Sequence, residues 1–217
     1  MPRRQPGKTP AQRMRAVVKI LARLYPDASC ALVFNNAFEV LIATILSAQT
    51  TDASVNAAAP ALFGKYPTPE KLAAATPEAV LPLIRTIGLY RNKSKYIVAC
   101  ARALVDRFGG VVPSAMDDLV SLPGAGRKTA NCVRVNAFHL PGIMCDTHCC
   151  RLSARIGLTD ETNPEKVERD LAGLMPEREW GDFSHRIIIH GRRVCHARTP
   201  DCDACAIRLH CRYAEAR

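Results

Sequence analysis

The sequence predicts an all-α protein, and three observations lead to this fold class. Apolar residues recur at helical spacing, as in residues 11–24, where one stripe contains Met14, Val17, Val18, Leu21 and Leu24. Helix boundaries are marked as well, because Thr-Pro-Glu at 68–70 and 76–78 supplies an N-cap, a first-turn proline and an acid. Strand signals are nearly absent, since no run of β-branched residues alternates with polar ones between turns.

The expected helices follow one another along the chain. Residues 11–24 form an amphipathic helix, and residues 38–46 are apolar nearly all round, which indicates a buried helix. Pro60 falls inside the next helical stretch, 52–63, so we expect that helix to be short or kinked. Residues 95–108 show helical spacing again, and two glycines end this helix.

Composition narrows the class of function. The chain has 217 residues, a 48% hydrophobic content and a formal net charge of +10, which favours a polyanionic partner as much as it favours a merely solvated basic surface. No uncharged apolar stretch of ~18 residues predicts a membrane span, and no apolar region follows the basic N-terminus as a secretory signal requires. The ten cysteines are too unevenly spread for a secreted disulfide scaffold, so we expect a cytoplasmic protein with a metal or cluster site.

The most informative stretch lies at residues 122–130 and reads LPGAGRKTA. Helical segments at 115–121 and 127–138 flank it, and Gly124 and Gly126 permit a tight turn between them. Such a turn aims backbone N–H groups and a helix N-terminus at one point, where they bind a phosphate with help from the neighbouring Arg127. The alternative is a helix connection that needs two glycines only for packing.

A weaker version of this pattern precedes the helix at 95–108. Residues 84–90 read IRTIGLY, and basic residues follow at Lys93 and Lys95. This segment is either a second turn that touches nucleic acid or a plain helix–loop–helix connection, and the two interpretations are equally supported by the sequence.

Two residues are candidates for catalysis. Lys128 falls in the first turn of a helix, where the macrodipole disfavours a protonated amine, and an unprotonated lysine can form a Schiff base with a sugar carbon. A phosphate contact is the simpler role for this lysine. Asp146 precedes an amphipathic run and reads first as an N-cap, a position that also favours an ionised carboxylate able to stabilise a sugar cation.

Four cysteines near the C-terminus give the strongest single signal. Cys195, Cys202, Cys205 and Cys211 are spaced C-x6-C-x2-C-x5-C. Four thiolates bind either a [4Fe–4S] cluster or one zinc ion. The spacing matches neither a bacterial ferredoxin nor the paired C-x2-C of a zinc ribbon, and four unligated cysteines in so short a run are improbable.

These motifs together resemble the endonuclease III superfamily of helix–hairpin–helix DNA glycosylases. The match covers the LPGAGRKTA stretch, the Asp-Thr-His segment at 146–148, the cysteine spacing and the sequence LSAQTTD at 46–52, and it runs in order from about Arg15 to Cys211. The resemblance implies that Lys128 attacks C1′ of a damaged nucleotide and that Asp146 is the second catalytic residue. It also implies that the four cysteines hold a [4Fe–4S] cluster.

Further expectations rest on the same resemblance. Gln49 would fill the gap left by a flipped base, Leu89 would wedge between bases, and His148 would touch DNA. A six-helix domain with the helix–hairpin–helix would span residues 30–140, and an iron–sulfur domain would combine residues 1–29 with 141–217. The implied protein is a monomeric, bacterial, nucleoid-associated glycosylase and abasic-site lyase, which acts on double-stranded DNA with oxidised pyrimidines or abasic sites.

Some positions depart from the family pattern. Cys145 stands where valine is usual, and Cys149 and Cys150 follow the histidine where apolar or aromatic residues are expected. The departures leave the catalytic groups in place but put the lesion range in doubt. Three alternatives therefore stay open: a monofunctional adenine-type glycosylase, which would lack the lysine at 128, a non-catalytic DNA-binding protein, and an electron-transfer iron–sulfur protein.

Overall fold

The computed structural model describes residues 8–215, and within this range it contains helices and no strands, as the sequence predicts. The chain divides into two compact units, one formed by Cys30–Leu140 and the other by Met1–Ser29 with Pro141–Arg217. None of the helices in the described part combines the length and apolar character needed to span a bilayer.

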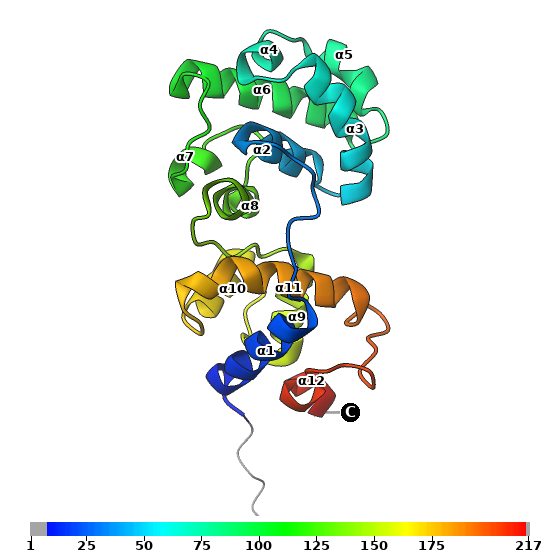
Figure 1. Ribbon diagram of the computed structural model, residues 1–217, viewed down its shortest axis with the longest axis vertical. Coiled ribbons are helices and arrows are strands. Elements are labelled where there is room, and N and C mark those ends of the chain that lie inside the picture. Colours follow the sequence, from blue (N-terminus) through cyan, green and yellow to red (C-terminus); the bar gives the residue numbers. More distant parts are fainter. Residues whose placement is uncertain (1–7, 216–217) are drawn as a thin grey trace, which may run out of the picture. The chain divides into compact units, whose positions relative to one another are not determined.

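The unit Cys30–Leu140 is built from seven α-helices and one 3-10 helix (Figure 1). In chain order they are α2 (Ala37–Leu46), α3 (Asp52–Lys65), α4 (Pro69–Ala73), α5 (Pro77–Val80), η1 (Leu81–Ile84), α6 (Tyr90–Phe108), α7 (Met116–Val120) and α8 (Arg127–Phe138). Helix α2 packs on α8, and α4 packs on α6. Every residue of α2 from Phe38 to Leu46 is buried, which confirms the expected buried helix.

Local sequence signals fix most helix ends in this unit. Thr68 and Thr76 cap α4 and α5, because their hydroxyls accept the backbone N–H groups of Lys71 and Ala79 at 3.4 and 3.3 Å. Gly109 ends α6 in the left-handed conformation at φ 59°, as expected, although the helix begins earlier than its apolar spacing indicates.

Of the two forms expected for the helix around Pro60, short or kinked, the short one is wrong. Helix α3 continues through Pro60 to Lys65, beyond the expected end at Phe63. Proline removes one N–H donor from the helix interior. Burial of Val55 and Leu62 on either side holds the helix together across that missing bond.

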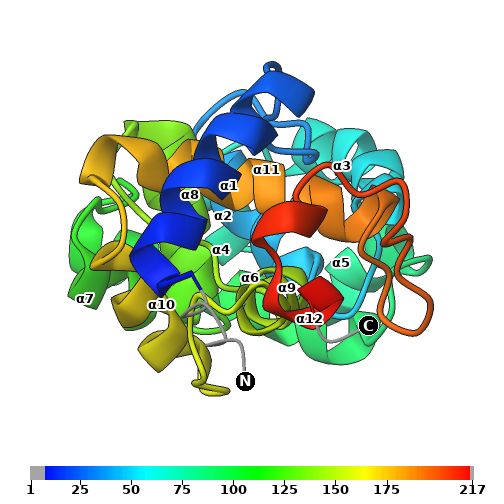
Figure 2. The ribbon, with the colours of Figure 1, turned by 90° about the horizontal axis from the view of Figure 1, so that it is seen from below.

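In the second unit, the described residues 8–29 and 141–215 form five α-helices and two 3-10 helices. They are α1 (Pro10–Leu24), α9 (Thr147–Ile156), α10 (Pro164–Ala172), η2 (Glu177–Glu179), α11 (Trp180–Arg193), η3 (Arg208–His210) and α12 (Arg212–Glu215). Figure 2 shows α11 next to α1 and α9, and these helices pack on one another. Their apolar faces meet in one core that includes Met14, Leu21, Leu152, Phe183 and Ile187.

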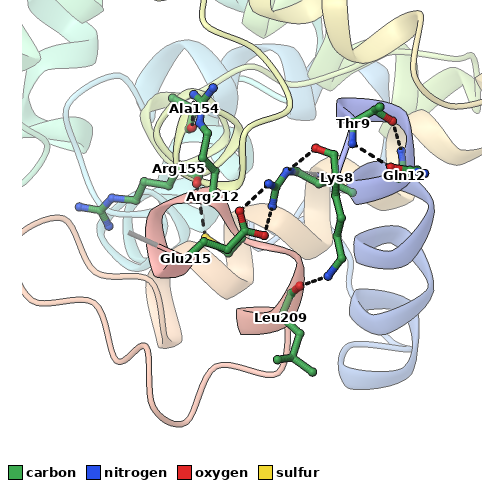
Figure 3. A network of polar contacts seen from close by, with 10 residues as sticks. Lys8, Thr9, Gln12, Ala154, Arg155, Leu209, Arg212 and Glu215 are labelled. Atoms are coloured by element: carbon green, nitrogen blue, oxygen red, sulfur yellow. Dashed lines mark hydrogen bonds and ion pairs between the residues drawn. The ribbon is translucent and has the colours of Figure 1, made fainter. Parts of the chain in front are cut away.

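The C-terminal helix is fastened to the rest of this unit by arginines (Figure 3). Nη1 and Nη2 of the buried Arg13 donate to the carboxylate of Glu215, at 3.0 and 2.7 Å. Arg212 donates to the carbonyl of Ala154 at 3.2 Å and pairs with Asp160 at 2.7 Å. A bidentate pair fixes geometry as well as charge, so α12 is held against both α1 and α9.

Candidate active site

The predicted hairpin forms between α7 and α8. Gly124 lies in the turn at φ +80°, and a Cβ atom at this position would come 3.0 Å from Tyr96 Cβ and 3.2 Å from Ile45 Cγ2. Both the backbone angle and the close packing therefore require glycine. At Gly126 the backbone is extended, with φ −88°, and an added Cβ would meet no atom within 4 Å.

The N-terminus of α8 is open for an anion. Gly126 occupies the N-cap position and, as a glycine, supplies no side-chain cap to the first turn. Arg127 and Lys128 occupy this first turn, and both are exposed. A helix N-terminus without a side-chain cap, beside two basic residues, has the charge and geometry that suit an anion.

Asp146 is the N-cap of α9, as the sequence predicts. Its Oδ1 accepts the backbone N–H of Cys149 at 2.8 Å, and the side chain is half-buried. Within residues 8–215, Oδ2 makes no hydrogen bond. The carboxylate is thus oriented through one oxygen while the other can face a ligand. Lys128 and Asp146 lie in different units, and each is positioned by the helix start that carries it.

His148 is tied to the interior of its own unit. Its Nδ1 lies 3.1 Å from Arg151 Nη2, and that nitrogen also donates to the carbonyls of Gly191 and Cys195 at 3.1 and 2.9 Å. Arginine can only donate, so Nδ1 is the acceptor and the ring proton is on Nε2. The role of Arg151 is not apparent from the sequence. In the structure it links the Asp-Thr-His segment to the cysteine loop.

Gln49 and Leu89 lie in two turns that touch. Both adopt left-handed backbone angles, with φ 52° and 58°, and both are exposed. The turns meet at Gly88, where a Cβ atom would lie 3.2 Å from Thr50 Oγ1 and 3.3 Å from the carbonyl oxygen of Gln49. Left-handed angles are unfavourable for residues with a Cβ, and such strain concentrates at functional sites.

Lys93 joins the same two turns, and its role was not apparent from the sequence. Its Nζ donates to Thr50 Oγ1 at 2.7 Å, while its backbone N–H donates to the carbonyl of Leu89 at 3.1 Å. The side chain is only 3% exposed, and this desolvation lowers the pKa of Lys93. A basic residue looks like a surface residue in sequence, so only the fold reveals this lysine as a buried link.

The four C-terminal cysteines line one pocket. Cys195, Cys202, Cys205 and Cys211 share it with apolar side chains from α9 and the loop, namely Leu152, Ile156 and Ile207. Arg155 holds the loop in place, because Nη1 donates to Cys195 Sγ at 3.3 Å and to the carbonyl of His196 at 2.7 Å. Over residues 8–215, no three His, Cys, Asp or Glu side chains are placed to hold a single metal ion.

Five of the other cysteines gather in two groups, one beside each candidate catalytic residue. The pKa of the buried Cys132 is lowered, first by the neighbouring thiol of Cys30 and also by the positive charge of Lys128. In the other group, Cys145 Sγ lies 4.0 Å from Cys149 Sγ, and Cys150 follows directly in the chain. Neither group belongs to the cluster motif.

Comparison with known proteins gives concordant matches. The family model described as "HhH-GPD superfamily base excision DNA repair protein" matches residues 42–177. An endonuclease III of Synechocystis is 46% identical over 94% of both chains, and that of Bacillus subtilis is 42% identical over 89% of both chains. A solved structure of a trapped covalent endonuclease III–DNA intermediate superposes with a TM-score of 0.91 at 43% identity, covering 95% of this chain and 98% of that one.

Proposed function

The chain belongs to the HhH-GPD superfamily of base excision DNA repair proteins and, within it, to the endonuclease III family, and we propose that it removes oxidised pyrimidines from double-stranded DNA. Membership of this family makes it a DNA glycosylase with lyase activity at abasic sites. One observation carries the assignment of the reaction to this chain: an exposed lysine, Lys128, follows a phosphate-binding turn in the first turn of α8.

The hairpin would bind the DNA backbone without reading its sequence. The N–H groups of the Gly124–Gly126 turn and of the start of α8 suit a phosphate, and Arg127 adds a positive charge. Leu89 and Gln49, on their touching turns, would enter the base stack and occupy the space of the displaced base. His148, fixed by Arg151 with Nε2–H available, would contact the DNA as a hydrogen-bond donor.

The reaction would proceed through a Schiff base on Lys128. The unprotonated amine attacks C1′ and displaces the damaged base, which leaves with a proton. Cleavage of the C1′–O4′ bond, with a proton passing from the nitrogen to O4′, then opens the sugar to an iminium that acidifies the proton on C2′. Loss of this proton drives β-elimination, which breaks the bond to the 3′ oxygen and cuts the strand. Asp146, held by its cap bond to Cys149, would stabilise positive charge on the sugar as the base leaves. The matched structure of a trapped covalent intermediate supports a covalent mechanism.

Borohydride trapping tests the role of Lys128. Wild-type protein should form a covalent adduct with DNA that carries an oxidised pyrimidine, while Lys128→Ala should abolish the adduct and retain most DNA binding, because the turn amides remain. Lys19→Ala serves as a control, since Lys19 also has an exposed amine but lies on α1, where no candidate site residue is found. A wild-type level of adduct in Lys128→Ala would show that another amine is the nucleophile. Base loss without adduct in the wild type would instead indicate a monofunctional enzyme.

A [4Fe–4S] cluster held by Cys195, Cys202, Cys205 and Cys211 completes the proposal. The fit is supported by the chemistry of the lining, in which four thiols share one pocket with apolar side chains. When bound, the cluster cross-links the loop and can exchange an electron. Purified protein should contain about four irons per chain. Cys202→Ser should lose iron and destabilise the loop, whereas Cys150→Ser, outside the pocket, should keep it; one zinc and no iron would contradict the proposal.

Two further expectations concern the oligomeric state and the cellular location of the protein. We expect the protein to be a monomer. We also expect the protein to associate with the nucleoid of a bacterial cytoplasm, where its DNA substrate lies. Size-exclusion chromatography with light scattering measures the first, and a stable dimer would contradict it.

A further inference from the structure

A buried histidine connects one cysteine of the pocket to a tyrosine from the other end of the chain. His190, on α11, is 1% exposed and lines the same pocket as the four cysteines. Its Nε2 lies 3.4 Å from Cys205 Sγ, and its Nδ1 lies 3.0 Å from the hydroxyl oxygen of Tyr25. Three distant segments of the sequence therefore form one chain of hydrogen bonds that ends on a candidate cluster ligand.

The chemistry of the three groups fixes the direction of both hydrogen bonds. A cysteine that ligates a metal is a thiolate, which can only accept, so His190 Nε2 must carry the proton. A neutral imidazole has a single N–H, so Nδ1 is then an acceptor and the Tyr25 hydroxyl is its donor. Neither ring nitrogen reaches solvent, so a misplaced proton would leave a buried polar atom without a partner.

The environment of Tyr25 keeps this arrangement in place. Tyr25 follows the end of α1 as its C-cap residue, and its backbone N–H donates to the carbonyl of Leu21 at 2.9 Å. Arg193 lies 5.8 Å from the centre of the tyrosine ring, and Arg186 donates to the Tyr25 carbonyl at 3.3 Å. Contacts on both the backbone and the ring thus hold the hydroxyl opposite His190.

We propose that His190 is a positioning residue that donates Nε2–H to the thiolate of Cys205 and tunes the reduction potential of the cluster, with Tyr25 setting the tautomer. This inference rests on the proposed [4Fe–4S] site. An N–H donor to a ligating sulfur withdraws charge from it and stabilises the more negative, reduced form, so it raises the potential. The other three cysteines would lack this donor from a histidine, and Cys205 would be distinguished from them.

Three variants separate the contributions of the groups in the Tyr25–His190–Cys205 hydrogen-bond chain. His190→Leu removes the donor, His190→Gln keeps an N–H donor without the ring, and Tyr25→Phe removes only the hydroxyl that holds the tautomer. Tyr213→Phe is the matched control, because Tyr213 lines the same pocket and its ring packs against Arg155, 5.0 Å away. Tyr25→Phe and His190→Gln keep the test informative if the leucine variant folds poorly.

The measurements are iron content, midpoint potential by film voltammetry and resonance Raman spectra in H₂O and D₂O. The potential should fall most in His190→Leu and less in Tyr25→Phe, and it should stay near the wild-type value in His190→Gln and Tyr213→Phe. A tenfold change in the ratio of oxidised to reduced protein corresponds to about 59 mV for one electron. The iron–thiolate bands should shift on deuteration in the wild type and lose that shift in His190→Leu.

The outcomes distinguish this inference from the cofactor proposal. Iron-loaded variants with unchanged potentials, or a fall in Tyr213→Phe equal to that in His190→Leu, would overturn the role of His190 and leave the cluster intact. Wild-type protein without iron would overturn both. Partial loss of iron from Tyr25→Phe, with an unchanged deuterium shift in the protein that keeps its iron, would mean that the tyrosine acts on folding and not on the tautomer.

Discussion

Substitution of Asp146 separates its role as a helix cap from its role in catalysis. Asp146→Asn keeps an oxygen that can accept the Cys149 N–H, now at 2.8 Å, and removes only the charge. The first turn of α9 contains no acidic residue. Within this helix start, the Asp146 carboxylate is therefore the negative charge that interacts favourably with the positive end of the helix dipole. Its loss should cost about 0.3–1 kcal/mol of stability. Asp146→Ala also deletes the cap and should cost about 1 kcal/mol more.

The predicted effect on catalysis is much larger than the effect on folding. Removal of a group that acts in the transition state typically slows a reaction by about 10²–10⁴-fold. For a protein of this size, about 1 kcal/mol lowers the melting temperature by roughly 2–4 °C. Asp146→Asn should therefore melt close to the wild type and yet excise bases at least about a hundredfold more slowly.

The assay combines single-turnover base excision at saturating enzyme, DNA affinity by fluorescence anisotropy and thermal melting. Asn163→Ala is the control, since Asn163 caps α10 in the same unit by accepting the N–H groups of Glu165 and Lys166 at 2.9 and 3.2 Å. It should lose stability as Asp146→Ala does and keep its excision rate. If Asp146→Asn excises bases within about tenfold of the wild type, the carboxylate acts only as a cap and its catalytic assignment is wrong.

Two further predictions concern the hairpin and the C-terminal helix. Gly124→Ala should lower the free energy of unfolding by at least about 1 kcal/mol, because it places a Cβ atom on a left-handed backbone and in close contact with Tyr96. The control, Gly126→Ala, should change the free energy of unfolding by less than about 0.5 kcal/mol. Equal effects of the two variants in thermal melts would contradict the turn geometry. The hydrogen bond from Arg13 lowers the pKa of Glu215 in the folded state, so this pair stabilises the fold above the unfolded pKa of about 4.3, and its contribution disappears as the pH falls through the lower folded value. Glu215→Gln should therefore flatten the acid side of the stability profile below about pH 5. Because the carboxylate is partly exposed, the change should be small, and an identical profile would show that the ion pair does not contribute.

The sequence by itself determined the features that depend on neighbouring residues. Thr68, Thr76 and Asp146 are caps in the structure because a side-chain oxygen reaches an N–H group only three residues away. Gly124 marks the hairpin because a positive φ is a local property of the backbone. Helix α8 begins directly after Gly126, so Lys128 lies in its first turn, and both features follow from the same short-range rules.

The tertiary structure decided what depends on packing between distant segments. Burial of Val55 and Leu62 carries α3 through Pro60, against the local preference of proline. The sequence alone would place the basic Lys93 on the surface. The residue is buried because the turns of Gln49 and Leu89 pack together next to it. In the hydrogen-bond chain from Tyr25 through His190 to Cys205, the contacting residues Tyr25 and His190 are 165 positions apart. No local pattern encodes such contacts, because they form only when apolar faces pack and the enclosed polar groups must find partners.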